Sequence, residues 1–211
     1  MEGWHKMKIF TTVTEGYTAE EIFEQFPKAF DKVRQFYLDN FCTSEFFSFD
    51  VKQDLEIMFP NSDFNLNYSL SYCQGDGFNI EGECNLYDFI NVWNATEKEK
   101  RTMIFYIDRC STTNYSFYKN NHYSYSCKSL DKKYIDDDIN ELVEDLQMWG
   151  IRGIKTDLIL RFYNDLVNHF AQLDKEYEEN GYNFFYEADN SDIIETCEAN
   201  DYYFTEEGEL I

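Results

Sequence analysis

Positive charge is scarce in this chain of 211 residues, and the scarcity is uneven. The sequence holds 18 Lys and Arg residues against 41 Asp and Glu residues, which gives a formal net charge of −23. Residues 136–211 contain 21 of these acids and only four bases, a net charge of −17, so the first 135 residues carry the remaining −6. Such a chain repels nucleic acid and anionic membranes, and it attracts basic partners over a Debye length of about 8–10 Å.

Three other features are rare or missing. The two prolines, Pro27 and Pro60, leave few obligatory breaks in helices and strands. No run approaches the roughly 18 apolar residues of a membrane span, and the first residues lack the apolar segment of a signal peptide, so we expect a cytoplasmic protein. The six cysteines form no C-x-x-C pair, which argues against a zinc site and indicates buried thiols in a reducing compartment.

Aromatic residues, by contrast, make up 19% of the chain. Acidic disordered segments are poor in aromatic residues, so this content predicts a folded protein with an aromatic core. The alternation of apolar and polar residues predicts strands over 64–72 and 78–84, joined by a tight turn. An apolar run predicts a further strand over 103–110 after a charged turn at 97–101, and a second hairpin is expected over 115–118 and 122–127.

Helical spacing of apolar residues begins after Thr18, which starts a capping box with Glu21. Pro27 either kinks this helix or begins a second one. Further helices are expected over 51–59, 86–93, 138–149, 156–180 and 191–199, and short strands over 7–14, 182–186 and 202–204. Together these elements predict an α+β fold in which a four-stranded antiparallel sheet packs against several amphipathic helices.

The chain divides, by this pattern, into three segments. Residues 1–60 form an N-terminal strand and helices, residues 61–135 the sheet region, and residues 136–211 an acidic helical region that packs with the sheet as one unit. No repeat or long linker separates the segments.

Several patterns that suggest chemistry have simpler structural interpretations. The sequence Gln74–Gly77 precedes no helix and therefore lacks the helix N-terminus of a phosphate loop, so we interpret it as a hairpin turn. Residues 150–156 differ from a P-loop in spacing and follow no parallel strand. The histidines at 5, 122 and 169 lie on different predicted elements, although Asp165 lies one turn before His169 and is suited to orient its ring. We expect no catalytic residues.

The carboxylates of residues 136–145 could hold a hard cation. The acids in this run are Asp136, Asp137, Asp138, Glu141, Glu144 and Asp145. They lack the alternating oxygens and the glycine of a calcium loop, and magnesium stays open. The start of a helix, where carboxylates are favourable, explains the run without a metal. No cofactor or metal is therefore predicted.

The acids between 174 and 209 are the candidate partner-binding residues. They accompany a single base, Lys175, and residues 174–211 have a net charge of −12. Ordinary surfaces mix charges of both signs, because segregated charge repels itself. A binding function explains such a segment better than solubility does. The candidates are Asp174, Glu176, Glu178, Glu179, Glu187, Asp189, Asp192, Glu195, Glu198, Asp201, Glu206, Glu207 and Glu209.

Three stretches of this sequence resemble small, mostly uncharacterised proteins of bacteriophages and prophages. Residues 71–78, S-Y-C-Q-G-D-G-F, resemble their S-x-x-Q-G-D-G stretch, and residues 121–126, N-H-Y-S-Y-S, echo a Y-Y-H-x-x-S-like segment. Residues 198–208, E-A-N-D-Y-Y-F-T-E-E-G, are similar to their E-x-N-x-Y-x-F-T-x-x-G ending. The resemblance leaves out the first 60 residues and transfers no activity. It implies a phage accessory protein that acts inside a bacterial host cell.

Acidic phage proteins of this size include anti-CRISPR proteins and restriction inhibitors that imitate nucleic acid. Resemblance and charge together suggest an anti-CRISPR-like inhibitor that occupies the basic nucleic-acid-binding surface of a defence nuclease. Two alternatives stay open: an antitoxin-like or regulatory module that binds a basic protein, and a metal-dependent enzyme that uses the carboxylates of residues 136–145. The expected partner is a basic host protein, with no direct contact to nucleic acid or membrane, and a homodimer stays open.

Overall fold

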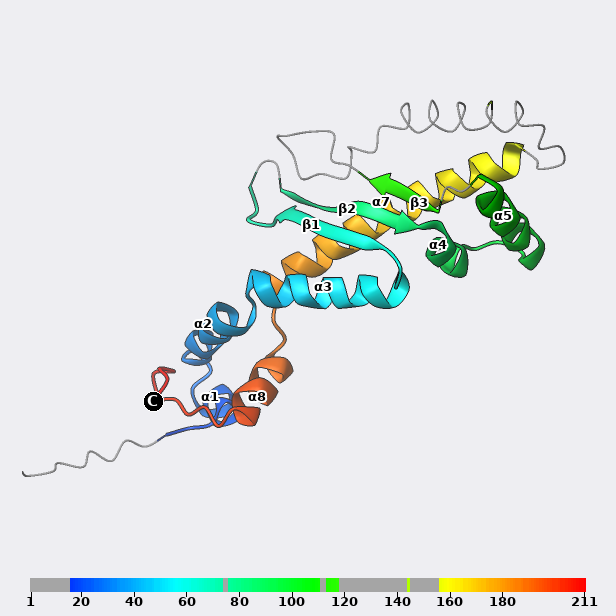
Figure 1. Cartoon of the computed structure of the whole chain (residues 1–211). Coiled ribbons are helices and arrows are strands. Elements are labelled where there is room, and N and C mark those ends of the chain that lie inside the picture. The colour runs from blue at the N-terminus through cyan, green and yellow to red at the C-terminus, as the bar shows by residue number, and fades with distance from the viewer. Residues whose placement is uncertain (1–15, 74–75, 111–112, 118–143, 145–155) are drawn as a thin grey trace, which may run out of the picture. The chain divides into compact units, whose positions relative to one another are not determined.

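The structure, a computed structural model, describes residues 16–73, 76–110, 113–117, 144 and 156–211 (Figure 1). The chain divides into two compact units. Residues 1–43 and 185–211 form one, here called the terminal unit, and residues 44–184 form the other, here called the central unit. The unit boundaries at 43 and 184 differ from the segment boundaries at 60 and 135 that the sequence suggested.

The central unit contains an antiparallel sheet in the order β1-β2-β3. Strand β1 (Asp63–Ser69) pairs with β2 (Gly77–Asn85) so that Tyr68 lies opposite Phe78, and β2 pairs with β3 (Asn114–Phe117). The α+β class is confirmed, but the described sheet has three strands rather than the expected four.

One expected strand, at 103–110, is part of a helix. Residues expected to form a charged turn and then a strand form α5 (Glu97–Cys110). Thr96 and Glu99 exchange hydrogen bonds between side chain and backbone, as in a capping box, and so begin the helix. Met103, Tyr106 and Ile107 are buried at helical spacing, whereas Phe105 is half exposed. A short apolar run fits a strand and a buried helix equally well, which explains the error.

Helix α7 (Thr156–Tyr186) runs along the sheet and supplies much of the aromatic core of the central unit (Figure 1). The ring of Phe170 lies 4.4 Å from that of Phe117, centroid to centroid. The expected helix end at 180 and strand at 182–186 are wrong, because α7 continues through both. Gly181 lies inside the helix, where a Cβ would come within 2.3 Å of Leu70 Cδ1, so this glycine allows close packing rather than ending the helix.

Two other helices complete the described part of the central unit. Helix α3 (Ser44–Met58) packs on β1, where the rings of Phe47 and Tyr68 make an edge contact, and helix α4 (Leu86–Val92) follows β2 directly. Asn85 caps α4 by accepting a hydrogen bond from the backbone N–H of Tyr87. Both helices were expected, and α3 is longer at its N-terminal end than the predicted range of 51–59.

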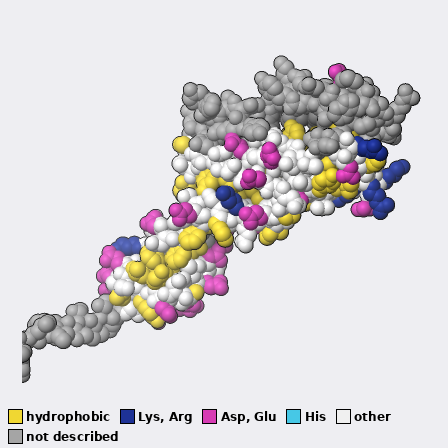
Figure 2. All heavy atoms as spheres, viewed as in Figure 1, with side chains coloured by type: hydrophobic (Ala, Val, Ile, Leu, Met, Phe, Trp, Pro, Cys, Tyr) yellow, Lys and Arg dark blue, Asp and Glu magenta, His cyan; other side chains and the backbone are white. Residues whose placement is uncertain are grey.

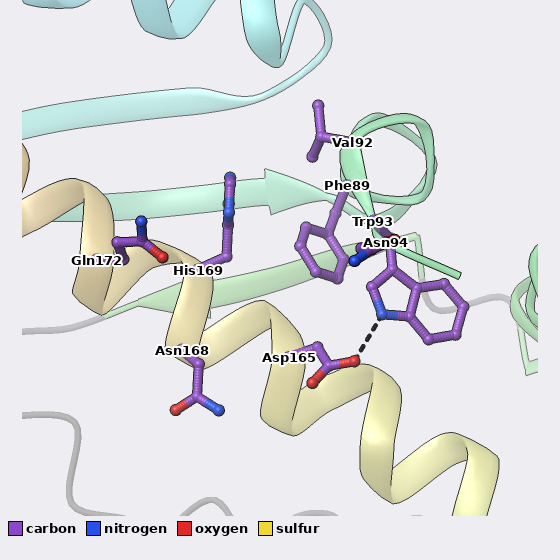
Figure 3. Close-up of a pocket in the computed structure, with 8 residues that line it drawn as sticks. All are labelled: Phe89, Val92, Trp93, Asn94, Asp165, Asn168, His169 and Gln172. Carbon is purple, nitrogen blue, oxygen red and sulfur yellow. Dashed lines mark hydrogen bonds between the residues drawn. The ribbon is translucent and has the colours of Figure 1, made fainter.

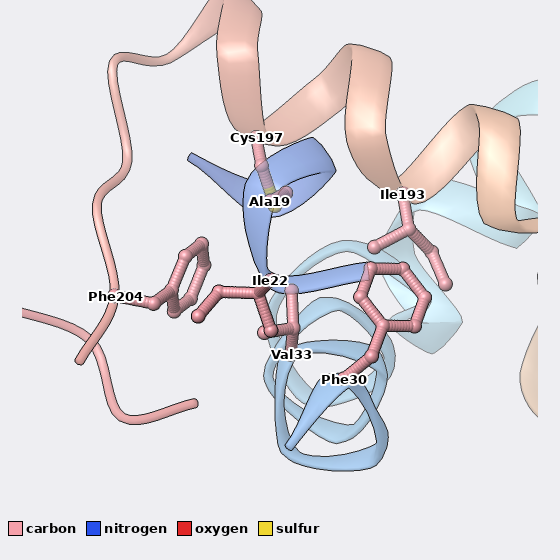
Figure 4. Packing of buried hydrophobic residues seen from close by; sticks show 7 residues of the cluster. All are labelled: Ala19, Ile22, Phe30, Val33, Ile193, Cys197 and Phe204. Atoms are coloured by element: carbon pink, nitrogen blue, oxygen red, sulfur yellow. The ribbon is translucent and has the colours of Figure 1, made fainter. Parts of the chain in front are cut away.

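The terminal unit joins helices from both ends of the chain. It contains α1 (Ala19–Gln25), α2 (Phe30–Phe41) and α8 (Asn190–Ala199). The predicted capping box of Thr18 and Glu21 is confirmed, and a break around Pro27 separates α1 from α2. Buried side chains from all three helices and from Phe204 form its core (Figure 4), which comprises Ala19, Ile22, Phe30, Val33, Ile193, Cys197 and Phe204.

Some expected elements cannot be compared with the structure. The strands at 7–14 and 122–127 lie outside the described residues, as does the helix at 138–149 apart from Glu144. The expected strand at 202–204 is reduced to isolated bridges of Phe204 with Tyr17 and Leu210. None of the helices in the described residues is long and apolar enough to cross a membrane.

Candidate functional site

The largest group of candidate acids lies on the terminal unit. Residues 185–211 contain nine acids and no Lys or Arg, and all nine are exposed. Figure 2 shows acidic side chains around this unit in the view that it presents. We call the nine residues the acidic surface: Glu187, Asp189, Asp192, Glu195, Glu198, Asp201, Glu206, Glu207 and Glu209.

Helix α8 holds the middle of the acidic surface. Ile193 and Cys197 are fully buried in the core of the terminal unit, one helical turn apart. The helical period then directs Asp192, Glu195 and Glu198 to the exposed side. Packing of the apolar face therefore fixes the backbone that carries these three carboxylates.

The acids after α8 are held by a tight turn. Gly208 donates a hydrogen bond from its N–H to the Thr205 carbonyl at 2.8 Å, and Thr205 N–H donates to the Glu209 carbonyl at 2.8 Å. Gly208 has a φ of 80°, and a Cβ there would lie 2.3 Å from the carbonyl oxygen of Ala29. Glycine is required on both grounds, and the turn seats Glu209 and its neighbours against the start of α2.

Few bases neutralise these acids. The described residues of the terminal unit contain 14 acids and three bases, a net charge of −11. Lys32 pairs with Glu209 at 2.9 Å, but both side chains are largely exposed. Arg34 donates to the carbonyl of Ala188 and to the side-chain oxygen of Asn190, which are neutral acceptors. Within the described residues, the other eight members of the acidic surface form no ion pair.

The remaining four candidates lie on α7 in the central unit, and one of them is misplaced by the sequence interpretation. Asp174 is only 2% exposed and accepts a hydrogen bond from the Ile80 backbone N–H at 2.8 Å. It supports the sheet and does not belong to an exposed surface. Glu176 and Glu179 are exposed, whereas Glu178 is partly buried, and that burial raises its pKa.

A hollow of about 300 Å³ lies between α4 and α7 (Figure 3). The predicted partnership of Asp165 with His169 is absent there, because Asp165 instead accepts a hydrogen bond from Trp93 Nε1 at 2.8 Å. Nε2 of His169 is buried without a hydrogen-bond partner among the residues that the structure describes, and burial lowers the pKa of this imidazole. The lining residues are Phe89, Val92, Trp93, Asn94, Asp165, Asn168, His169 and Gln172. They include no Ser, Cys or Thr nucleophile that His169 could activate.

Asp76 organises the hairpin turn that follows β1. Its carboxylate accepts hydrogen bonds from Ser69 Oγ, from the backbone N–H groups of Ser71 and Cys73, and from Tyr182 Oη, at 2.7–3.0 Å. The thiol of Cys73 donates a further bond at 3.1 Å. Burial raises the pKa of Asp76, but the bonds from Cys73, Ser69 and Ser71 outweigh it and hold the pKa well below its usual range. The carboxylate is therefore fully used by the fold.

The sequence interpretation missed a second charged surface. Helix α5 carries four bases, and its exposed side presents Lys98, Arg101 and Arg109 together with Ile104 and Phe105. Because residues 97–101 were assigned to a turn and residues 103–110 to a strand, the bases of the region were not considered together. A helical projection of residues 97–110 would have brought Lys98, Arg101 and Arg109 onto one face.

The metal-dependent alternative gains no support from the described residues. The carboxylates of residues 136–145 lie outside them apart from Glu144, and so do His5 and His122. Among the residues that the structure describes, no group of three or more His, Cys, Asp or Glu side chains could hold a metal ion.

Comparisons of the chain with protein-family models, with curated proteins and with solved structures find no match. The resemblance to phage proteins therefore stays a prediction.

Proposed function

We propose that this protein is an inhibitor that acts by occupation: its acidic surface binds a basic, nucleic-acid-binding surface of a bacterial defence nuclease and keeps nucleic acid out. One observation carries the proposal. Residues 185–211 hold nine exposed acids and no base on a packed core, and eight of these acids have no ion pair within the described residues.

The density of charge on α8 supports mimicry of nucleic acid. Glu198 lies six residues after Asp192, with Glu195 midway, which is about 9 Å of helix at about 1.5 Å per residue. This places one carboxylate per about 4.5 Å, compared with one phosphate per about 3.4 Å along a DNA strand. A groove lined with Arg and Lys side chains for phosphates can therefore pair with such a row of carboxylates.

Solubility alone explains the acidic surface less well. A soluble protein gains colloidal stability from net charge, but interspersed bases limit the repulsion between neighbouring acids. The terminal unit makes little use of its bases in this way, since Arg34 binds neutral acceptors and Lys32 pairs only with Glu209. The unit thus retains a repulsive surface, and a basic partner would relieve that repulsion on binding.

The proposal is tested with purified defence nucleases, using CRISPR effectors and restriction endonucleases bound to fluorescent duplex DNA as the probe. The protein should displace the DNA stoichiometrically, with a break near equivalence that is insensitive to EDTA. Raising the salt from about 0.05 M to about 0.5 M should weaken its binding by at least about tenfold, mainly through a slower on-rate.

A matched pair of variants locates the contact. Reversal of Asp192, Glu195 and Glu198 to Lys should abolish displacement. Reversal of three exposed acids on α3, Glu45, Asp50 and Glu56, changes the net charge equally and should preserve most of it. Equal losses in both variants would show that only net charge matters. Inactivation at trace amounts, or a requirement for a metal ion, would overturn inhibition by occupation.

A further inference from the structure

Helix α5 presents an exposed face that differs in charge from the rest of the protein. Its opposite side is fixed in the core of the central unit by Met103, Tyr106 and Ile107, which are at most 1% exposed. This packing directs the other side of the helix outward. The exposed residues Lys98, Arg101, Ile104, Phe105 and Arg109 form what we call the basic face.

The positive charge of this face is local: α5 carries four bases against three acids, Glu97, Glu99 and Asp108. The described residues of the central unit contain seven bases, of which four lie on α5, and Arg161 contacts the helix from α7. Figure 2 shows most of the dark blue side chains of the central unit at the end where α5 lies.

The acids of α5 are mostly engaged within the fold. Glu99 pairs with Arg161 at 3.0 Å, and Arg161 together with the backbone N–H and hydroxyl of Thr96 holds the pKa of Glu99 down to about 2. Asp108 accepts a hydrogen bond from the hydroxyl of Tyr87. Glu97 and Asp108 are exposed, but within the described residues Lys98, Arg101 and Arg109 form no ion pair and so stay available for a partner.

An apolar centre lies among these bases. Phe105 is 50% exposed and Ile104 is 37% exposed. The guanidinium carbon of Arg109 lies 5.1 Å from the centroid of the Phe105 ring, which is a cation–π distance. An apolar centre within a charged rim is the anatomy of a protein-binding patch.

We propose that the basic face of one molecule binds the acidic surface of a second copy of the chain. The C-terminal part of the acidic surface is complementary in both charge and apolar character. Tyr203 is 48% exposed and Leu210 is 46% exposed, and they lie in the segment that carries Glu206 and Glu207. Opposite charges on the rims steer the two surfaces together and set their register.

This contact joins two different surfaces, so each molecule keeps one of each kind available. Such head-to-tail contacts close into rings or extend into chains, unlike the contact of a two-fold dimer. The patch is small and its charges are exposed, so the association is weak, reversible and sensitive to salt. The inference does not depend on the proposed inhibitory function.

Sedimentation velocity of the full chain tests the proposal. In about 0.05 M salt the weight-average sedimentation coefficient should rise with protein concentration, and in about 0.5 M salt it should return to the monomer value. A monomer at all concentrations in low salt would overturn the proposal. A concentration-independent, salt-dependent change in shape would also overturn it, because that outcome indicates a contact within one molecule.

Paired charge reversals identify the two surfaces. Arg101→Glu with Arg109→Glu alters the basic face, and Glu206→Lys with Glu207→Lys alters the acidic surface. Each double variant alone should stay monomeric, whereas an equimolar mixture should associate, because native contacts re-form between unlike molecules. Failure of the mixture to associate, with unchanged circular dichroism and melting of both variants, would overturn the proposal.

Two controls complete the experiment. Reversal of Lys52 and Lys175, exposed bases outside α5, should leave self-association intact, and an equal loss in this variant would overturn the assignment to α5. A fluorescent single-stranded oligonucleotide tests whether the basic face binds nucleic acid instead of the acidic surface. If it binds the wild type and not the Arg101→Glu, Arg109→Glu variant, while the wild type stays monomeric, the basic face binds nucleic acid and self-association is refuted.

Discussion

The two units of this protein use their carboxylates differently. In the central unit several acids are part of the fold: Asp88 accepts three hydrogen bonds from Asn61 and Ser62, and Asp76 organises a turn. In the described terminal unit, by contrast, the acids of residues 185–211 face solvent, and only Glu209 has an ion pair. Tertiary contacts thus account for several acids of the central unit and for few of those in residues 185–211.

Removal of a buried acid should give the largest effect. Asp88 and Asp192 both lie in the first turn of a helix, but Asp88 is only 2% exposed. Asp88→Ala leaves the N–H of Asn61 and the hydroxyl of Ser62 without their acceptor, and should lower the free energy of unfolding by about 3 kcal/mol. Asp192→Ala should change it by no more than about 0.5 kcal/mol. Urea unfolding measures both, and equal losses would refute the contrast between the units.

Two glycines test whether the units unfold separately. Gly82 has a φ of 128°, with the Asp63 carbonyl oxygen 2.1 Å from where a Cβ would lie, and Gly208 is similarly restricted by Ala29. Replacement of either by Ala should destabilise its own unit by about 1–3 kcal/mol. Hydrogen exchange, measured separately over the two units, should show faster exchange of the central unit in Gly82→Ala and of the terminal unit in Gly208→Ala. Loss of protection in both units for each variant would show a single cooperative unit.

The smallest expected effect depends on pH and is confined to the central unit. Burial lowers the pKa of His169 from its ordinary value of 6.5, so the unfolded chain binds this proton more tightly than the folded one. The contribution of neutral His169 is complete above about pH 6.5 and is lost as the pH falls through its folded-state pKa. His169→Phe should therefore reduce the decline in unfolding free energy between about pH 7.5 and about pH 5.5. An unchanged decline would refute this assignment.

The sequence predicted features that depend on neighbouring residues better than features that depend on distant ones. The capping box of Thr18 and Glu21 and the β1–β2 hairpin were predicted because their signals lie within a few residues. Helix α5 was assigned wrongly because a continuous apolar run shows no clear period, and the capping signal of Thr96 and Glu99 was not recognised before the turn assigned to 97–101.

The assignment of the candidate site residues was likewise limited by the lack of three-dimensional information. Asp174 was grouped with the surface acids because its neighbours in sequence are charged, yet its acceptor role depends on Ile80, which lies 94 residues away. The basic face was missed because its bases come together only when α5 is known to be a helix. In both cases the assignment required the three-dimensional contacts of the side chain.

The sequence by itself determined the amount of charge, its concentration toward residue 211, the aromatic content and the local start signals of helices and hairpins, since these depend on composition and near neighbours. Only the tertiary structure decided that Asp88 and Asp174 are buried acceptors while Asp192 is exposed, and that both ends of the chain form one unit. The reason is physical: burial and hydrogen bonding depend on which distant segments pack together, and charge alone carries no information about that packing.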